Sequence, residues 1–501
     1  QGEFSVVFDT DLPSYKTAGG VHRHPNGLAV TAPPLMWAEA LDLLFARMAD
    51  AHFPFAVVAA VSGSGQQHGS VYFNKGARAA LRKLDPARPI AEQVKGLFSI
   101  DASPVWMDSS TTRECANLEK ALGGPQGVAD LTGSRAYERF TGNQIAKIAK
   151  TRRAAYAKTE RIALVSSYMA SLIAGDYAPI DVSDGSGMNL MDIRAREWAS
   201  RALAACAPLL KTKLGSLAPS HTAIGGISKY CVTRYGFTPT CTVIVFSGDN
   251  PNSVAGLRLD KSGDIAISLG TSDTMFAALS EPRPSATEGH IFASPVDPAG
   301  YMALLCYKNG SLTREFIRDH FAGGTWEQFN ALLASNPPGN RGRIGFYYRE
   351  PEITPPVLKP GFMRFDVSGN LLSHFTPPEE VRAVVEGQFL SMRLHGDNIG
   401  IRPARIMATG GASQNPAIIK IMADVFGVPV FTGEIANSAA LGAAYRALHG
   451  WTCNAKGAFV PFARAVKGAS QFKQAAGPDT EAHAIYTDML GRYAGLEKRI
   501  A

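Results

Sequence analysis

The stretch from Cys241 to Thr274, CTVIVFSGDNPNSVAGLRLDKSGDIAISLGTSDT, constrains the fold more than any other part of the chain. Its pattern predicts a buried strand at Thr242–Phe246, a short helix from Pro251, a tight turn, and a second strand that ends at Gly270–Ser272. Asp249 would then lie at the carboxyl end of a strand, where a proton acceptor can face a ligand. The Gly270–Ser272 turn offers backbone N–H groups of the kind that bind phosphate. A base beside a phosphate-binding turn indicates phosphoryl transfer.

Local sequence leaves a second interpretation open for each of these features. Asp249 or Asn250 can cap the helix that begins at Pro251, because Asx residues before proline favour a helix start. The two roles are compatible, since Asn250 can cap the helix while Asp249 faces a ligand. A hairpin would use Gly270 and Thr271 equally well. The stretch therefore needs support from other parts of the chain.

The composition is that of an ordinary globular protein with more than one domain. The chain has 501 residues, more than one hydrophobic core usually serves, and 46% of them are hydrophobic and 19% charged. The formal charge of +7 is dispersed, so nucleic acid is not an expected partner. The most apolar run, from Ile162 to Ala174, is too short to span a bilayer, so no membrane partner is expected either. The six cysteines form no CxxC pair, which favours reduced thiols in a cytoplasmic protein.

Expected strands and helices alternate along the chain, which predicts α/β domains with mainly parallel sheets. An amphipathic helix is expected at Leu35–Ala51, and a buried strand at Ala56–Ser62 leads into a loop that carries His68. A second strand, Arg405–Thr409, leads into the loop Gly410–Asn415. Since ligands bind beyond the carboxyl ends of parallel strands, both loops are candidate binding sites. The two halves echo each other coarsely, which predicts two domains, 1–241 and 242–501.

Each loop also has a simpler interpretation. A lone His68 would more often be structural, but the adjacent Gln66 and Gln67 favour hydrogen bonds to a polyol. The double glycine at Gly410–Ser413 suits a nucleotide, and it equally suits a tight turn between a strand and a helix. The sequence around Arg139 does not decide between a packed arginine and a donor to substrate oxygens.

Five short motifs resemble, in order, the signature of the FGGY family of carbohydrate kinases. They are GQQHG at 65–69, WMD at 106–108, GDN at 248–250, SLGT at 268–271 and GGAS at 410–413. Longer strings, including SGSGQQHGSVYF, VWMDSSTTRE and PIDVSDGSGMNL, are similar to the eukaryotic-type xylulose kinases of that family. The resemblance runs from Asp11 to Ile500. It implies two actin/hexokinase-like (ribonuclease H-like) domains flanking a catalytic cleft, a sugar-binding domain at 1–241 and a nucleotide-binding domain at 242–501.

The resemblance also implies an activity, the ATP-dependent phosphorylation of D-xylulose to D-xylulose 5-phosphate. Asp249 would be the general base, and Mg²⁺ would bridge the phosphates and reach Asp249 through water. The residues implied to contact D-xylulose are His68, Arg139, Asp249 and Asn250. The residues implied to bind ATP are Gly270 and Thr271 at the phosphates and Trp326, Gly411, Ala412 and Asn415 at the adenine nucleotide.

One departure from the family pattern leaves alternatives open. Members open with a strand-turn-strand that carries a Gly-x-Asp-x-Ser/Thr-Thr phosphate loop, and this chain begins after that position. An N-terminally truncated sugar-binding protein, catalytically weak or silent, is therefore one alternative, and an FGGY kinase for another pentulose or polyol is a second. The expected assembly is a monomer or homodimer.

Overall fold

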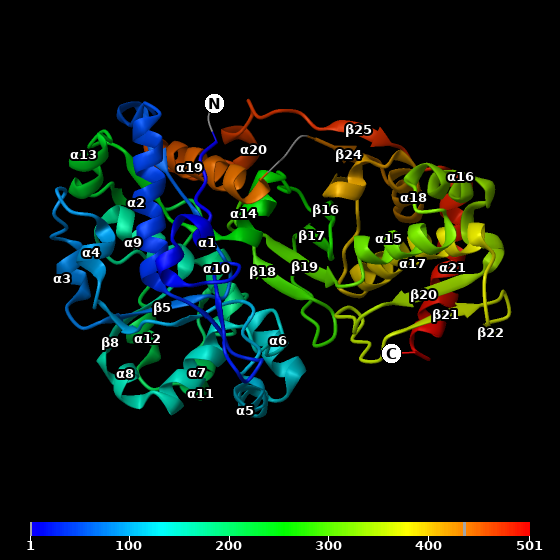
Figure 1. The fold of residues 1–501 in the computed structure, drawn as a ribbon, viewed down its shortest axis with the longest axis horizontal. Helices are drawn as coiled ribbons and strands as arrows, with labels where there is room; N and C mark the ends of the chain where they lie inside the picture. Colours follow the sequence, from blue (N-terminus) through cyan, green and yellow to red (C-terminus); the bar gives the residue numbers. More distant parts are fainter. Residues whose placement is uncertain (1–2, 434–436, 501) are drawn as a thin grey trace. The chain divides into compact units, whose positions relative to one another are not determined.

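The structure is a computed structural model that describes residues 3–433 and 437–500 (Figure 1). The chain forms two compact units, each assembled from separate segments. Unit 1 comprises the described residues up to 258, 292–300 and 437–467, and unit 2 comprises 259–291, 301–433 and 468–500. The domain boundary expected after residue 241 stays a prediction, and in the structure residues 242–258 pack with unit 1. All six cysteines are free thiols, and no helix in the described ranges is long and apolar enough to cross a membrane.

Unit 1 is rich in helices that cover small sheets. Its helices of seven residues or more are α2 (Pro34–Asp50), α5 (Thr112–Leu122), α6 (Pro125–Thr132), α7 (Thr141–Thr151), α9 (Val165–Ala174), α11 (Ser200–Cys206), α13 (Lys229–Tyr235), α14 (Asp249–Gly256) and α19 (Ser438–Lys456). The helix expected at Leu35–Ala51 is confirmed as α2, whose apolar face buries Trp37, Leu41 and Phe45 in the core.

Two pairs of short parallel strands position the first candidate loop of unit 1. Strand β3 (Ala60–Val61) pairs with β14 (Thr242–Ile244), and β4 (Ser64–Gly65) pairs with β15 (Ser247–Gly248). Because both pairs are parallel, the residues that follow β4 and β15 emerge at the same edge. Gly65 lies opposite Gly248 in this register.

The prediction of a buried strand at Ala56–Ser62 is wrong. Residues Phe55–Val57 form a 3-10 turn after Pro54, and only Ala60–Val61 pair with a neighbouring strand. Val57 is 76% exposed. A continuous apolar run predicts that a segment is buried, but it does not predict how many of its residues pair with a neighbouring strand. Here only two residues pair with β14.

Unit 2 is built on a seven-stranded sheet with helices around it. The strand order is β18 (His290–Ala293), β19 (Tyr301–Tyr307), β17 (Asp273–Leu279), β16 (Asp264–Leu269), β23 (Arg405–Thr409), β24 (Val430–Thr432) and β25 (Lys473–Ala476). The last two residues of β18 are assigned to unit 1. Its longer helices are α15 (Ser311–Phe321), α16 (Trp326–Ser335), α17 (Pro377–Asn398), α18 (Pro416–Phe426) and α21 (Thr480–Glu497), and α17 packs against the other four (Figure 1).

The sheet is mixed, whereas the alternation of elements predicted a mainly parallel one. Only three residues connect β16 to β17, so these strands must run antiparallel. Strands β16, β23 and β24 are parallel, because helical segments such as α18 carry the chain back between them. The turn after β16 and the loop after β23 therefore emerge at the same edge, as expected for a binding site.

Candidate active site

Asp249 is the first residue of α14 and follows the N-cap residue Gly248 directly. Its Oδ1 accepts hydrogen bonds from the backbone N–H groups of Gln67, at 3.2 Å, and Asn250, at 3.0 Å. Burial raises the pKa of Asp249, and these two N–H donors act in the opposite direction. The carboxylate thus has a helix N-terminus on one side and a separate loop on the other. Such a group is suited to accept a proton from a bound hydroxyl.

The side chain of Gln67 ties the two loops of unit 1 together. Asn250 Nδ2 donates to Gln67 Oε1 at 2.7 Å, next to the backbone contact between Gln67 and Asp249. The parallel pairing of β4 and β15 explains why residues so distant in sequence meet here. Of the two Asx residues, neither acts as a side-chain N-cap, because the N-cap position belongs to Gly248. The capping interpretation of Asn250 is therefore not what the structure contains.

His68 is buried on the same loop and is held from two sides. Its Nδ1 lies 2.9 Å from the carbonyl oxygen of Gly187, and its ring stacks on Phe140 with centroids 4.4 Å apart. A carbonyl oxygen only accepts, so Nδ1 carries the proton and Nε2 is left as an acceptor. Burial, and then the charge of Arg139, lower the pKa of His68 to about 3. The ring is therefore neutral at physiological pH.

Arg139 lies beside His68 and stacks on aromatic rings. Its guanidinium carbon is 5.1 Å from the ring centroid of Tyr137 and 5.6 Å from that of Phe140. The structure thus brings His68 and Arg139 together around Phe140, and Asp249 and Asn250 together around Gln67. Their assignment as sugar ligands stays a prediction. Gly187 has no side chain, and a Cβ at that position would lie 3.3 Å from the His68 ring.

The position of α14 depends on close contact with α19. A Cβ on Gly256 would lie 2.1 Å from the carbonyl oxygen of Ser438, and a Cβ on Gly442 would lie 1.7 Å from that of Asn252. Arg446 of α19 is fully buried, and its NH1 donates to Asn252 Oδ1 at 3.1 Å. Both glycines are required for this packing, which fixes the helix that begins with Asp249.

The second candidate site is a pocket of about 590 Å³ in unit 2, a size typical of small-molecule sites. It is lined by all six residues implied to bind ATP, namely Gly270, Thr271, Trp326, Gly411, Ala412 and Asn415. Sequence reasoning missed four further polar lining residues, Ser311, Glu315, Asn330 and Gln414. The spacing in the sequence could have predicted Asn330, because it is one helical turn from Trp326 and lies on the same face of α16.

The loop after β23 shows why a double glycine stands in this pocket. Gly410 has φ +81°, and a Cβ there would lie 2.5 Å from the carbonyl oxygen of Leu269. A Cβ on Gly411 would meet no atom within 4 Å. The first glycine is therefore needed for the fold of the loop, and the second leaves open space at the wall of the pocket.

Asn415 and Trp326 have structural contacts as well. Asn415 caps α18 by accepting from Ala417 N at 3.0 Å, and its Nδ2 donates to Asn330 Oδ1 at 2.9 Å. The Arg318 guanidinium lies 4.9 Å from the ring centroid of Trp326. Both side chains are thus held in place at the pocket wall, and their role in nucleotide binding stays a prediction.

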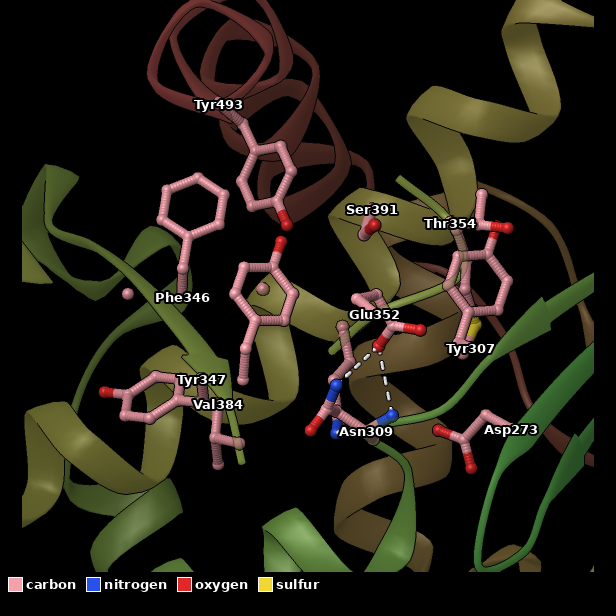
Figure 2. A pocket seen from close by; sticks show the side chains of 15 residues that line it. Asp273, Tyr307, Asn309, Phe346, Tyr347, Glu352, Thr354, Val384, Ser391 and Tyr493 are labelled. Carbon is pink, nitrogen blue, oxygen red and sulfur yellow. Dashed lines mark hydrogen bonds between the residues drawn. The ribbon is translucent and has the colours of Figure 1, made fainter. Parts of the chain in front are cut away.

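The Gly270 turn is supported from behind by buried polar groups. Ser311 N–H donates to the carbonyl oxygen of Gly270 at 2.8 Å, and Arg314 pairs with Asp273 at 2.6 Å. Figure 2 shows Asp273 and Asn309 at the wall of a small cavity of about 40 Å³ in unit 2. Asn309 also donates through Nδ2 to Glu352 at 2.8 Å, as drawn in that view. This network restrains the turn that is expected to meet phosphate.

A dedicated metal cage is not found within residues 3–433 and 437–500, where no group of three or more His, Cys, Asp or Glu side chains could hold an ion. A polar site around a half-buried carboxylate in unit 1 and a Gly-rich pocket in unit 2 fit the class of phosphotransferases.

Comparison with known proteins identifies the class more closely. Residues 96–256 match the N-terminal domain, and residues 265–451 the C-terminal domain, of the FGGY family of carbohydrate kinases. The chain is 52% identical to the xylulose kinase of Mus musculus, covering 99% of this chain and 90% of that protein. It is 52% identical to xylulose kinase 2 of Arabidopsis thaliana, covering 92% and 85% respectively.

A solved structure described as a xyloylose kinase from Brucella ovis has the same fold, with a TM-score of 0.77 at 22% identity over 95% of this chain and 92% of that one. The chain belongs to the FGGY family of carbohydrate kinases. The predicted fold class is thereby confirmed, and ATP is the phosphoryl donor that this family implies.

Proposed function

We propose that this chain transfers the γ-phosphoryl group of ATP to D-xylulose and forms D-xylulose 5-phosphate. The observation that carries the proposal is the 52% identity, over almost the whole chain, to two proteins named xylulose kinase. The polar cluster around Asp249 supports it, because a polyol needs several hydrogen-bonding groups that converge. The same identity favours an active kinase over a silent sugar-binding protein.

Asp249 is the general base of the proposed reaction. It orients the 5-hydroxyl of the sugar and takes its proton as the bond to phosphorus forms. Its raised pKa fits this role, since a carboxylate that holds a proton more tightly is the better acceptor. Asn250, His68 and Arg139 hold the remaining oxygens of D-xylulose. Neutral His68 offers Nε2 as an acceptor for a sugar hydroxyl.

ATP occupies the pocket of unit 2 in this proposal. Backbone N–H groups of the Gly270–Thr271 turn approach the phosphates, and Gly411, Ala412, Asn415 and Trp326 hold the adenine nucleotide. Mg²⁺ accompanies the nucleotide and neutralises charge on the phosphates. It is normally bound by one or two carboxylates, waters and substrate phosphates, so a single carboxylate such as Asp249, through water, fits its chemistry.

We also propose that the protein works in the cytoplasm as a monomer or homodimer, without nucleic-acid or membrane partners. Reduced cysteines agree with a reducing compartment. An FGGY kinase that acts on another pentulose or polyol keeps the same mechanism and changes only the acceptor.

A substrate panel with ATP and Mg²⁺ tests the proposal. ADP release is followed in a coupled assay with D-xylulose, L-xylulose, D-ribulose and glycerol as acceptors. We expect D-xylulose to give the highest kcat/KM. A higher value for another acceptor would reassign the substrate, and no turnover with any acceptor would contradict the kinase function.

A further inference from the structure

Asp184 is a buried carboxyl group next to the proposed sugar site, and the proposed mechanism gives it no task. It lies in the short helix α10 (Val182–Gly185) and is 3% exposed. Its Oδ2 accepts a hydrogen bond from Ser166 Oγ at 2.5 Å. Its Oδ1 is buried and has no hydrogen-bond partner among the described residues.

The unpartnered oxygen of Asp184 lies directly against the backbone that presents Asp249. A Cβ built on Gly248 would be 2.7 Å from Asp184 Oδ1 and 2.3 Å from Cγ of Gln67. The Asp184 and Gln67 side chains therefore pack closely against Gly248, the residue that precedes Asp249. No larger residue fits at Gly248, so the backbone is confined by this contact.

Gln67 connects Asp184 to the groups that are proposed to touch the sugar. Its Oε1 accepts from Asn250 Nδ2, and its backbone N–H donates to Asp249 Oδ1. Its Nε2 is buried and, like Asp184 Oδ1, has no hydrogen-bond partner among the described residues. A buried donor and a buried acceptor thus lie side by side around Gly248, and a small adjustment of the Gln67 amide would pair them.

The charges around Asp184 favour its neutral form. Asp181 and Asp249 are acids nearby, and Arg446 is a nearby cation, whose NH2 lies 3.7 Å from Asp181 Oδ1. Burial, together with the charges of Asp181 and Asp249, raises the pKa of Asp184 to about 7, while the hydrogen bond from Ser166 and the nearby amide of Gln67 act in the opposite direction. Arg446 lies nearest to Asp181, and the raised pKa of Asp184 favours a bound proton on that side chain.

We propose that Asp184 is a positioning residue for phosphoryl transfer, which braces Gln67 and Gly248 from behind and so holds Asp249 and Asn250 toward the sugar. This inference rests on the proposed function, because it assigns the purpose of the brace to that reaction. The neutral form keeps the hydrogen bond from Ser166 and an acceptor that faces Gln67, without placing another negative charge beside Asp249.

Two substitutions separate positioning from bulk structure. Asp184→Asn keeps the shape and mimics the protonated acid, whereas Asp184→Ala removes the brace. With D-xylulose at pH 6.5, we expect Asp184→Ala to lower kcat of the folded protein by about tenfold or more, because small misplacement of a base is costly. Asp184→Asn should lose no more than about threefold. Asp130→Asn, an exposed acid on α6, is the matched control.

Thermal unfolding tests the protonation without any substrate. The folded chain keeps a proton on Asp184 between about pH 4 and 7 that the unfolded chain has lost, so stability falls as the pH rises over this range. The melting temperature of Asp184→Asn relative to the wild type should therefore be higher at pH 7.5 than at pH 5.0.

The inference is overturned by equal kcat losses in the two variants, by a folded Asp184→Ala with wild-type kcat, or by a melting difference that does not change with pH. If Asp184→Ala does not fold, the kcat of Asp184→Asn and the melting comparison decide alone. If the xylulose assignment is wrong, the wild type will show no turnover with D-xylulose. The melting comparison does not depend on the substrate, so it tests Asp184 independently of that assignment.

Discussion

The backbone N–H of Gln67 donates a hydrogen bond to Oδ1 of Asp249 at 3.2 Å, although the two residues are separated by 182 positions. The contact exists because β4 and β15 pair in parallel and release their following residues at one edge. One loop therefore supplies a donor to the proposed base, and the other supplies the base itself. This geometry makes the carboxylate orientation depend on both segments.

The two glycines at the end of β23 should respond differently to alanine. Gly410→Ala places a Cβ at φ +81° and 2.5 Å from the Leu269 carbonyl, so we expect the free energy of unfolding to fall by about 2 kcal/mol or more. Gly411→Ala meets open space, so its stability should change by no more than about 0.5 kcal/mol. If the nucleotide passes here, the KM for ATP of Gly411→Ala rises by about threefold or more.

Denaturant unfolding and ATP kinetics on both variants check this pair. Equal losses of stability would contradict the assigned loop geometry. An unchanged KM for ATP in Gly411→Ala would count against a nucleotide at that wall of the pocket.

His68 should bind sugar in one protonation state across the physiological range. Burial and the charge of Arg139 lower its pKa to about 3, below the usual value of 6.5. Sugar affinity should therefore show no histidine titration between pH 5 and 8. Any stability that neutral His68 contributes is lost only as the pH falls from 6.5 toward 3.

His68→Asn should raise the KM for D-xylulose by about tenfold, the loss of roughly one hydrogen bond. The exposed His52 of the same unit gives the matched control, His52→Asn. Binding that weakens around pH 6.5 in the wild type, and no longer does so in His68→Asn, would show that His68 is protonated in this range and refute its neutral form.

His395 should stabilise unit 2 in a pH-dependent way. Burial lowers its pKa, but the hydrogen bond between one ring nitrogen and Glu288, and the Glu497 carboxylate 3.1 Å from the other ring nitrogen, outweigh burial and raise the pKa to about 9. The raised value means that the extra stability is complete below pH 6.5 and is lost as the pH rises through 9. His395 thereby links α17 to Glu497 at the end of α21.

We therefore expect His395→Gln to lower the free energy of unfolding by up to about 3 kcal/mol at pH 6 and by clearly less at pH 9.5. The control is the exposed His374→Gln. A loss that is the same at both pH values would mean that the ion pairs do not contribute.

Sequence patterns predicted those elements that depend mainly on neighbouring residues in the chain. The helix α2 follows from its amphipathic spacing, and the order of strand, Asp249, helix and Gly270 turn within 241–274 is present as expected, with a shorter first strand. The apolar run Ala56–Ser62 failed as a strand because pairing depends on what a neighbouring segment offers.

The rest of the site could not be predicted because it is assembled from distant segments. Asp184 carries no local mark of its burial, which arises where α10, Gln67 and Gly248 meet. Arg446 looks like an ordinary helix residue, yet it reaches Asn252 from α19, 194 positions away. In unit 2, Gln414 lines the pocket because β16 and β23 are neighbours in the sheet, and Ser311 because its backbone N–H donates to the carbonyl oxygen of Gly270.

The central claim is that Asp249 is the base in phosphorylation of D-xylulose. The most direct measurement compares the wild type with Asp249→Asn, and with Asp130→Asn as control, by following ADP and D-xylulose 5-phosphate with ATP and Mg²⁺ present. We predict a loss in kcat of about 100-fold or more for Asp249→Asn, with D-xylulose still bound by calorimetry and the control near the wild type. Turnover by Asp249→Asn within about threefold of the wild type would contradict the account.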